Sequence, residues 1–286
     1  VDKIFSYPTI KDLSNYIENE SIKIKSIKIN KAEKQPFYPL SSGQKRIYYA
    51  CQKNNTSTAY NVAGAFVIDT ILDKDKVQNA FNTIIKNNIA FRTYFRKVDG
   101  TPMQFILDDI DFKINCFKDK IDNPKKLIDT FSKPFNLEEC PLLRVELHYL
   151  NNNQSAILID SHHIILDGVS LDVFMKEFCN IYSGNTPSKN TIDYIDYSVW
   201  ENNFNKSSDI ISIENYWLNK FKDISNPILN LPYDYANNVN TFRANRINKI
   251  IPDDIFKKFN LKCIKVISSA ILLMTFIFGV KKYENS

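Results

Sequence analysis

Residues Ser161–Ser170 read SHHIILDGVS. Two adjacent histidines, His162 and His163, end an apolar run in a chain that holds only three histidines. The run SAILID before them predicts a buried strand, and the segment after them predicts a helix. Neighbouring residues of a strand point to opposite faces of the sheet, so we expect one imidazole to be buried and the other exposed.

The flanking segments predict a chain of mixed helices and strands. LLRVELHYL, residues 142–150, alternates apolar and polar residues and turns into the strand before the histidines, which predicts a hairpin whose second strand is central. We expect the following helix to be capped by Ser170, to carry Asp172 in its first turn and to end at Gly184. Further helices are predicted to begin at Ser41 and to span residues 9–20, 73–88, 124–133, 192–204 and 212–221. Further strands are predicted over residues 59–69 and on both sides of Asp99-Gly100. Ser41 and Gln44 have the spacing of a helix capping box.

Composition and charge exclude several classes of protein. The 37 basic and 32 acidic residues give a formal charge of +5. They are spread along the chain, which favours a solvated surface over a nucleic-acid footprint. The five cysteines form no CxxC pair and are odd in number, as expected of a reduced, cytoplasmic protein.

Membrane association is not expected either. The chain begins without Met and without a signal-peptide pattern. Its most apolar run, Val266–Val280, has 15 residues, which is short of the roughly 20 that cross a bilayer. We interpret this run as a buried core helix.

The paired histidines allow several kinds of chemistry. Adjacent strand residues rarely share one ion, and no Cys or Glu stands at zinc-like spacing, so no metal site is expected. No GxSxG motif is present to supply a nucleophilic serine. What remains is a buried pair held by backbone bonds, or a neutral imidazole that acts as a base or anchors an amine. Asp167 either shapes the loop or holds it through an ion pair with an arginine.

HHIILDG, residues 162–168, resembles the HHxxxDG motif of the condensation domains of nonribosomal peptide synthetases. Five further segments resemble motifs of this family, in the family's order: LSSGQKRIYYACQ (40–52), FRTYF (91–95), FNLEECPLLRVEL (135–147), YIDYSVW (194–200) and LPYDYANNVNTFRANR (231–246). IFSYPTIKDLSNYIE, residues 4–18, resembles the last helix of a carrier protein. The Gly-x-Phe-x-Asn-Thr motif of the family's second lobe is missing.

The resemblance implies a domain organisation. We expect the C-terminal helix of a carrier protein at residues 1–20, a linker at 21–36, the N-terminal lobe of a condensation domain at 37–250 and the start of a C-terminal lobe at 251–286. The implied fold class is α/β, an α+β two-layer sandwich of the chloramphenicol-acetyltransferase type. The C-terminal lobe would be largely missing, so we expect the isolated chain to be inactive and to self-associate.

The resemblance also implies a reaction and its participants. The domain would join a donor carrier-bound acyl thioester to the amine of an acceptor carrier-bound aminoacyl thioester. His163 would be the base or the positioning group, and His162 would have a structural role. Asp167 would support the loop. Gly168 would either leave room for the substrate arm or serve only the geometry of the turn. No cofactor or metal would bind directly, because upstream and downstream carrier proteins deliver phosphopantetheine arms, next to an adenylation domain. Epimerisation, ester-forming acyl transfer and a non-catalytic carrier-docking lobe remain alternatives.

Overall fold

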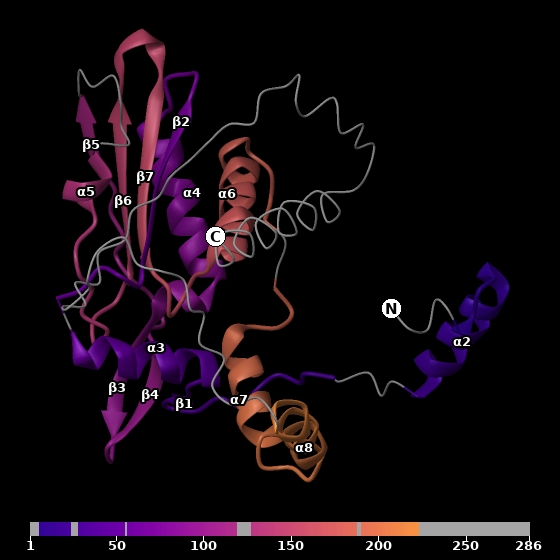
Figure 1. Ribbon diagram of the computed structural model, residues 1–286. Helices are drawn as coiled ribbons and strands as arrows, with labels where there is room; N and C mark the ends of the chain where they lie inside the picture. The colour runs from indigo at the N-terminus through magenta and orange to yellow at the C-terminus, as the bar shows by residue number, and fades with distance from the viewer. Residues whose placement is uncertain (1–5, 24–27, 55, 119–126, 188–189, 223–286) are drawn as a thin grey trace, which may run out of the picture. The chain divides into compact units, whose positions relative to one another are not determined.

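The computed structural model describes residues 6–23, 28–54, 56–118, 127–187 and 190–222. Its helices are α2 (Ile10–Lys23), α3 (Ser42–Lys53), α4 (Lys74–Asn87), α5 (Ile128–Phe131), α6 (Gly168–Tyr182), α7 (Tyr194–Phe204) and α8 (Asp209–Phe221), with 3₁₀ turns η1 (Ile89–Arg92) and η3 (Asn151–Asn153). Its strands are β1 (Tyr38–Pro39), β2 (Asn61–Ile68), β3 (Thr93–Val98), β4 (Thr101–Ile106), β5 (Asn115–Lys118), β6 (Leu143–Tyr149) and β7 (Ser155–His162) (Figure 1).

The chain divides into two compact units, residues 1–215 and 216–286. Most of the second unit lies outside the described residues. So do the motif-like segment at residues 231–246, the apolar run Val266–Val280 and the expected start of a C-terminal lobe. Near the N-terminus, Thr9 caps α2, because its hydroxyl oxygen accepts a hydrogen bond from the Asp12 amide at 3.1 Å.

A four-stranded mixed sheet forms the centre of the first unit, in the order β2-β7-β6-β5. The predicted hairpin is confirmed, since β6 and β7 are antiparallel and Val145 lies opposite Ile159. All eight residues of β7 are buried, as expected of a central strand. β5 adds a short parallel edge beside β6, which the sequence did not predict.

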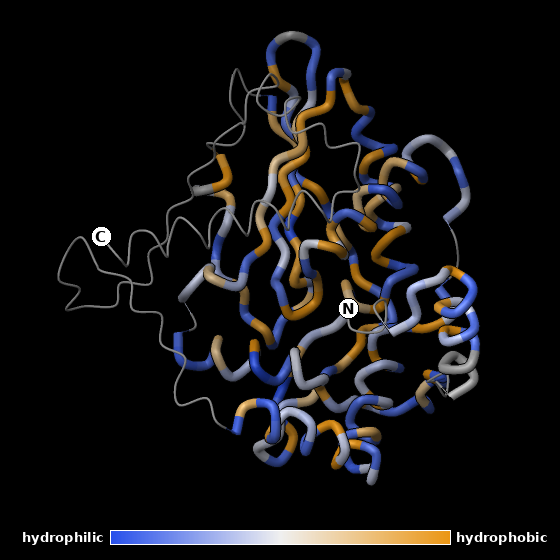
Figure 2. The backbone as a smooth tube through the Cα atoms, turned by 45° about the vertical axis from the view of Figure 1, so that its right-hand side comes forward, coloured by the Kyte–Doolittle hydropathy of each residue, from blue (hydrophilic) through white to orange (hydrophobic). Residues whose placement is uncertain are grey.

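Successive side chains of β7 point to opposite faces of this sheet, and each face packs against a different hydrophobic cluster. Ile157 and Ile159 belong to the main core with Phe81 of α4 and Phe174 of α6. Ala156 and Leu158 point to the other face, where Leu158 packs in a smaller cluster with Phe131. Figure 1 shows α4 and α6 side by side along the sheet, and Figure 2 shows hydrophobic segments running through the strands and these helices.

A second sheet, in the order β1-β4-β3, lies beside α3 and α7. β3 and β4 meet at the predicted turn, where Asp99 and Gly100 have φ angles of 47° and 79°. Two left-handed residues in succession match the twist of an antiparallel hairpin. The Ser41–Gln44 capping box is also confirmed, because each side chain accepts a hydrogen bond from the other residue's amide.

The start of α6 differs from the prediction. Asp167, not Ser170, is the N-cap residue, and the helix begins at Gly168. Asp172 therefore lies beyond the first turn. An aspartate and a serine three residues apart are both good caps, so residue type alone did not decide between them. The predicted end is confirmed, since Gly184 follows the helix with a φ of 87°.

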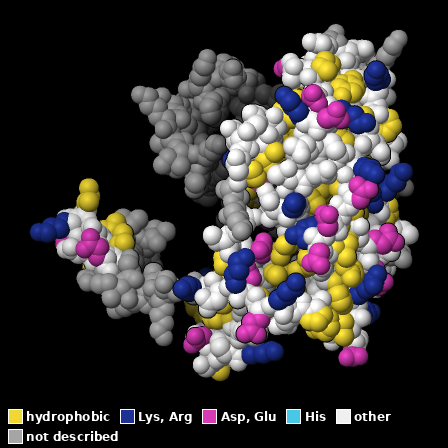
Figure 3. Space-filling model, turned by 180° about the vertical axis from the view of Figure 1, so that it is seen from behind, with side chains coloured by type: hydrophobic (Ala, Val, Ile, Leu, Met, Phe, Trp, Pro, Cys, Tyr) yellow, Lys and Arg dark blue, Asp and Glu magenta, His cyan; other side chains and the backbone are white. Residues whose placement is uncertain are grey.

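Charged side chains on the surface are mixed in sign. On the face shown in Figure 3, basic and acidic side chains alternate with hydrophobic ones. Among the described helices, none is both long enough and apolar enough to cross a membrane.

Candidate functional site around His163

The loop between β7 and α6 presents the two histidines on opposite sides. β7 ends at His162, whose carbonyl accepts a hydrogen bond from the Ile165 amide at 3.1 Å and closes a turn. The His163 amide donates to the Tyr60 carbonyl at 2.7 Å, which continues the pairing of β2 with β7 by one residue. The register of the sheet therefore fixes which histidine faces the interior.

His162 is buried, with 4% of its surface exposed. Its Nδ1 accepts a hydrogen bond from the Ile164 amide at 3.2 Å, and its Nε2 lies 3.5 Å from Cys51 Sγ. The rings of Tyr60 and Phe135 flank it. Burial lowers the pKa of His162 to about 4, so its ring is neutral at pH 7.

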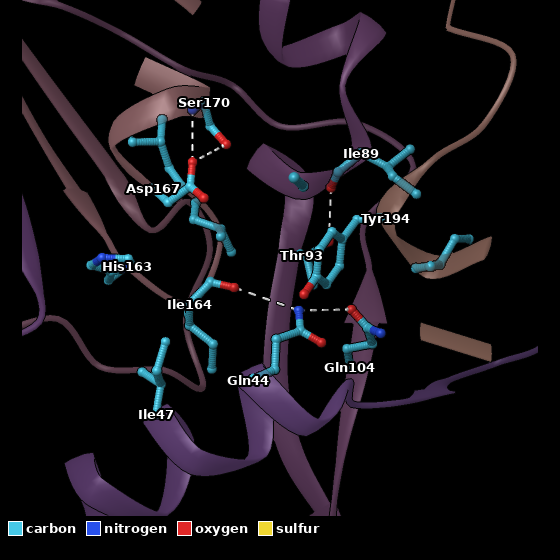
Figure 4. Close-up of a pocket in the computed structure, with 15 residues that line it drawn as sticks. Gln44, Ile47, Ile89, Thr93, Gln104, His163, Ile164, Asp167, Ser170 and Tyr194 are labelled. Carbon is cyan, nitrogen blue, oxygen red and sulfur yellow. Dashed lines mark hydrogen bonds between the residues drawn. The ribbon is translucent and has the colours of Figure 1, made fainter. Parts of the chain in front are cut away.

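His163 is exposed and lines a pocket of about 230 Å³. Figure 4 shows His163, Ile164 and Asp167 on one loop, with Gln44 of α3 and Tyr194 of α7 on other elements around the pocket. Segments far apart in the sequence thus surround one small space beside an accessible imidazole.

Asp167 holds the loop from the α6 side. One of its carboxylate oxygens accepts hydrogen bonds from the Ser170 amide at 2.7 Å and the Ser170 hydroxyl at 2.6 Å. These bonds, the hydroxyl first, lower the pKa of the Asp167 carboxyl. Among the described residues, no arginine forms an ion pair with it. The structure therefore supports loop shaping by Asp167 through a helix cap.

Gly168 occupies the first position of α6 with open space around it. Its φ lies outside the left-handed region, and no atom lies within 4 Å of the position that a Cβ would take. The backbone therefore does not require glycine here, which removes turn geometry as the reason for this residue.

Gln44 contributes to the site in a way that the sequence did not reveal. Its side-chain oxygen completes the capping box, while its Nε2 faces the Ile164 carbonyl at 3.5 Å and Gln104 Oε1 at 3.4 Å (Figure 4). Gln104 in turn donates to Ser198 of α7 at 2.8 Å. The capping-box pattern already accounted for Gln44, so nothing in that pattern pointed to the second contact.

Tyr194 was also missed as a pocket residue. It begins α7, lines the same pocket as His163, and its hydroxyl lies 2.9 Å from Ser41 Oγ. The available signal was the motif-like segment YIDYSVW, which begins at Tyr194.

The arrangement suits proton transfer or orientation of a nucleophile. An exposed imidazole can take a proton from an attacking group or hold that group by a hydrogen bond. In the part of the chain that the structure describes, no group of three or more His, Cys, Asp or Glu residues could hold a metal ion.

Comparison with known sequences identifies close relatives. A family model described as "Condensation domain" matches residues 34–281. The chain is 36% identical over 257 residues to bacitracin synthase 3 of Bacillus licheniformis, in an alignment that covers 90% of this chain and 4% of that protein. It is 35% identical over 232 residues to gramicidin S synthase 2 of Brevibacillus brevis, in an alignment that covers 81% of this chain and 5% of that protein. The chain thus spans only a small part of these relatives' length.

Solved structures show the same fold. The starter condensation domain of rhizomide synthetase aligns with a TM-score of 0.60 and 22% identity, over 68% of this chain and 50% of that one. A chain from the complex of the X-domain and OxyB from teicoplanin biosynthesis aligns with a TM-score of 0.64 and 21% identity, over 73% of this chain and 48% of that one. These alignments confirm the predicted fold of the chloramphenicol-acetyltransferase type.

Proposed function

Because this chain belongs to the condensation domain family of nonribosomal peptide synthetases, we propose that it acts in forming an amide bond between two carrier-bound substrates. The donor is an acyl thioester on a phosphopantetheine arm, and the acceptor is an aminoacyl thioester on a second arm. The acceptor amine attacks the donor carbonyl, so a C–N bond forms and the C–S bond breaks. The amine loses a proton, and the thiolate released from the donor arm takes up a proton, which leaves a free thiol on that arm.

His163 is the residue that we assign to this step. A thioester is already activated, so alignment of the two groups and exclusion of water supply most of the rate enhancement. The observation that carries the assignment is the exposure of His163 in the pocket, while both ring nitrogens of His162 face partners in the interior. His163 accepts the amine's proton or orients the amine, and His162 has a structural role.

Asp167 and Gly168 support this step without taking part in proton transfer. Asp167 holds the loop through the cap of α6. Gly168 leaves room for a substrate arm, a role that the open space around its Cα supports.

The proposal extends to the parts of the chain and their partners. Residues 1–20 are the last helix of a carrier protein, 21–36 the linker, 37–250 the N-terminal lobe and 251–286 the start of the C-terminal lobe. The partners are the donor and acceptor carriers and an adjacent adenylation domain, and no nucleic acid or membrane takes part. The protein acts in the cytoplasm, where reduced thiols persist, and the four described cysteines are free.

Amide formation by the complete synthetase module that contains this chain tests the proposal. Donor and acceptor carriers are loaded with aminoacyl thioesters, and the dipeptidyl carrier is followed by intact-protein mass spectrometry. We expect product from the wild type and a loss of about 10²-fold or more in rate for His163→Ala. His148→Gln is the matched control, because His148 is a buried histidine on β6, outside the pocket.

Other outcomes identify the alternatives. No product from a folded and loaded wild type would reject amide formation. Inversion of the carrier-bound aminoacyl centre would then indicate epimerisation, and product only with a hydroxyacyl acceptor would indicate ester formation. Carrier binding without any turnover would indicate a docking lobe. Equal rates for the wild type and His163→Ala would reject the role of His163 alone.

A further inference from the structure

We infer that Cys51 is a positioning residue, whose thiol accepts the hydrogen bond of His162 Nε2–H and fixes the ring that holds the loop carrying His163. The inference rests on the proposed function of His163 and adds a residue of α3 to the site. The contact joins residues 111 positions apart in the sequence.

The tautomer of His162 follows from its contacts. The Ile164 amide donates to Nδ1 at 3.2 Å, so Nδ1 presents a lone pair and carries no proton. A neutral imidazole holds one proton, which must therefore be on Nε2. Nε2–H points to Cys51 Sγ at 3.5 Å. Burial raises the pKa of the Cys51 thiol, so sulfur acts here as a neutral acceptor and not as a thiolate.

This ring takes the place of a backbone partner in the turn after β7. The Ile164 amide is bound by the ring, and the Ile165 amide is bound by the His162 carbonyl at 3.1 Å. His163 lies in the chain between His162, which accepts both hydrogen bonds, and the two residues that donate them, on the loop seen in Figure 4. If the ring rotates, the Ile164 amide loses its acceptor and the orientation of His163 is no longer fixed.

Cys51 is well placed to prevent that rotation. It lies near the end of α3, a helix that is anchored by its capping box and by the buried Tyr48. A buried N–H without an acceptor is unfavourable, so the thiol favours the one ring orientation that satisfies both nitrogens. The opposite tautomer would aim an N–H at the Ile164 amide, donor against donor.

Substitution of Cys51 in the complete module tests the consequence for the reaction. We expect Cys51→Ala to lower kcat about five- to tenfold, which is the effect of one lost neutral hydrogen bond, with KM for the loaded carriers unchanged. Cys51→Ser keeps an acceptor and should restore kcat to within about twofold of the wild type. Cys116→Ala is the control, because it removes another half-buried thiol, on β5.

Nitrogen NMR of the full chain, labelled with ¹⁵N only at its three histidines, tests the tautomer directly. We expect the wild type to show a protonated Nε2 and an unprotonated Nδ1 at His162, and Cys51→Ala to show exchange between tautomers. A protonated Nδ1 in the wild type overturns the inference, and so does an unchanged kcat in a folded Cys51→Ala module. The tautomer is read without turnover, so it stays decisive if no amide forms and the proposed function fails.

Discussion

His162 should make folding sensitive to mild acid. Its pKa is lowered to about 4 in the folded chain, against about 6.5 when unfolded. Between these values the unfolded chain binds the extra proton, so the free energy of unfolding is undiminished above about pH 6.5 and falls as the pH drops towards 4. From pH 7 to pH 4.5 we expect a loss of about 2–3 kcal/mol from this residue.

Urea unfolding at a series of pH values measures this loss. His162→Asn is the comparison, because an amide oxygen can still accept from the Ile164 amide but does not titrate. The variant should lose about 2–3 kcal/mol less than the wild type between pH 7 and pH 4.5. If the free energy of unfolding fell equally with pH in the two proteins, the His162 ring would not be held neutral by burial. Groups such as Asp160, whose pKa is raised by burial, are common to both and cancel in the difference.

At the level of secondary structure, α6 is positioned by its cap. Asp167 accepts two hydrogen bonds from Ser170, and an asparagine oxygen could accept the same two. We expect the free energy of unfolding of Asp167→Asn to lie within about 0.5 kcal/mol of the wild-type value. That of Asp167→Ala should be about 1 kcal/mol lower. Thermal unfolding at pH 7 separates the cap from an ion pair, since an ion pair would make both variants equally destabilised.

Local patterns in the sequence predicted most elements but not every boundary. The capping box at Ser41 and the turn at Asp99-Gly100 were predicted because each depends on residues close together in the chain. β5 was missed because four residues, NCFK, carry little periodic signal and are held by pairing with β6. The contact of Cys51 with His162 could not be predicted, because it depends on how α3 packs on the sheet.

In the whole molecule, the pairing of β2, β6 and β7 decides what the histidines can do. A slip of one residue in β7 would bury His163 and expose His162. Asp160, fully buried on the same face as His162, opposes such a slip, because Arg144 lies 2.8 Å from its carboxylate and Asn61 donates to it at 3.0 Å. A slip in register would leave the buried Asp160 carboxylate without these partners, which is unfavourable. The site therefore depends on contacts well outside the loop that displays it.

The exposed side chains of α8 lead to a last prediction, that the chain self-associates. Large apolar side chains of α8 are exposed, among them Leu218 at 63% and Trp217 at 50%. Apolar side chains gathered on one helix drive association when nothing covers them. We expect the sedimentation coefficient of the chain to rise with protein concentration. Leu218→Glu should weaken this rise, whereas Asn219→Glu, which adds the same charge at the next exposed position, should not. A monomer at every concentration, or equal effects of the two substitutions, would show that α8 does not mediate association.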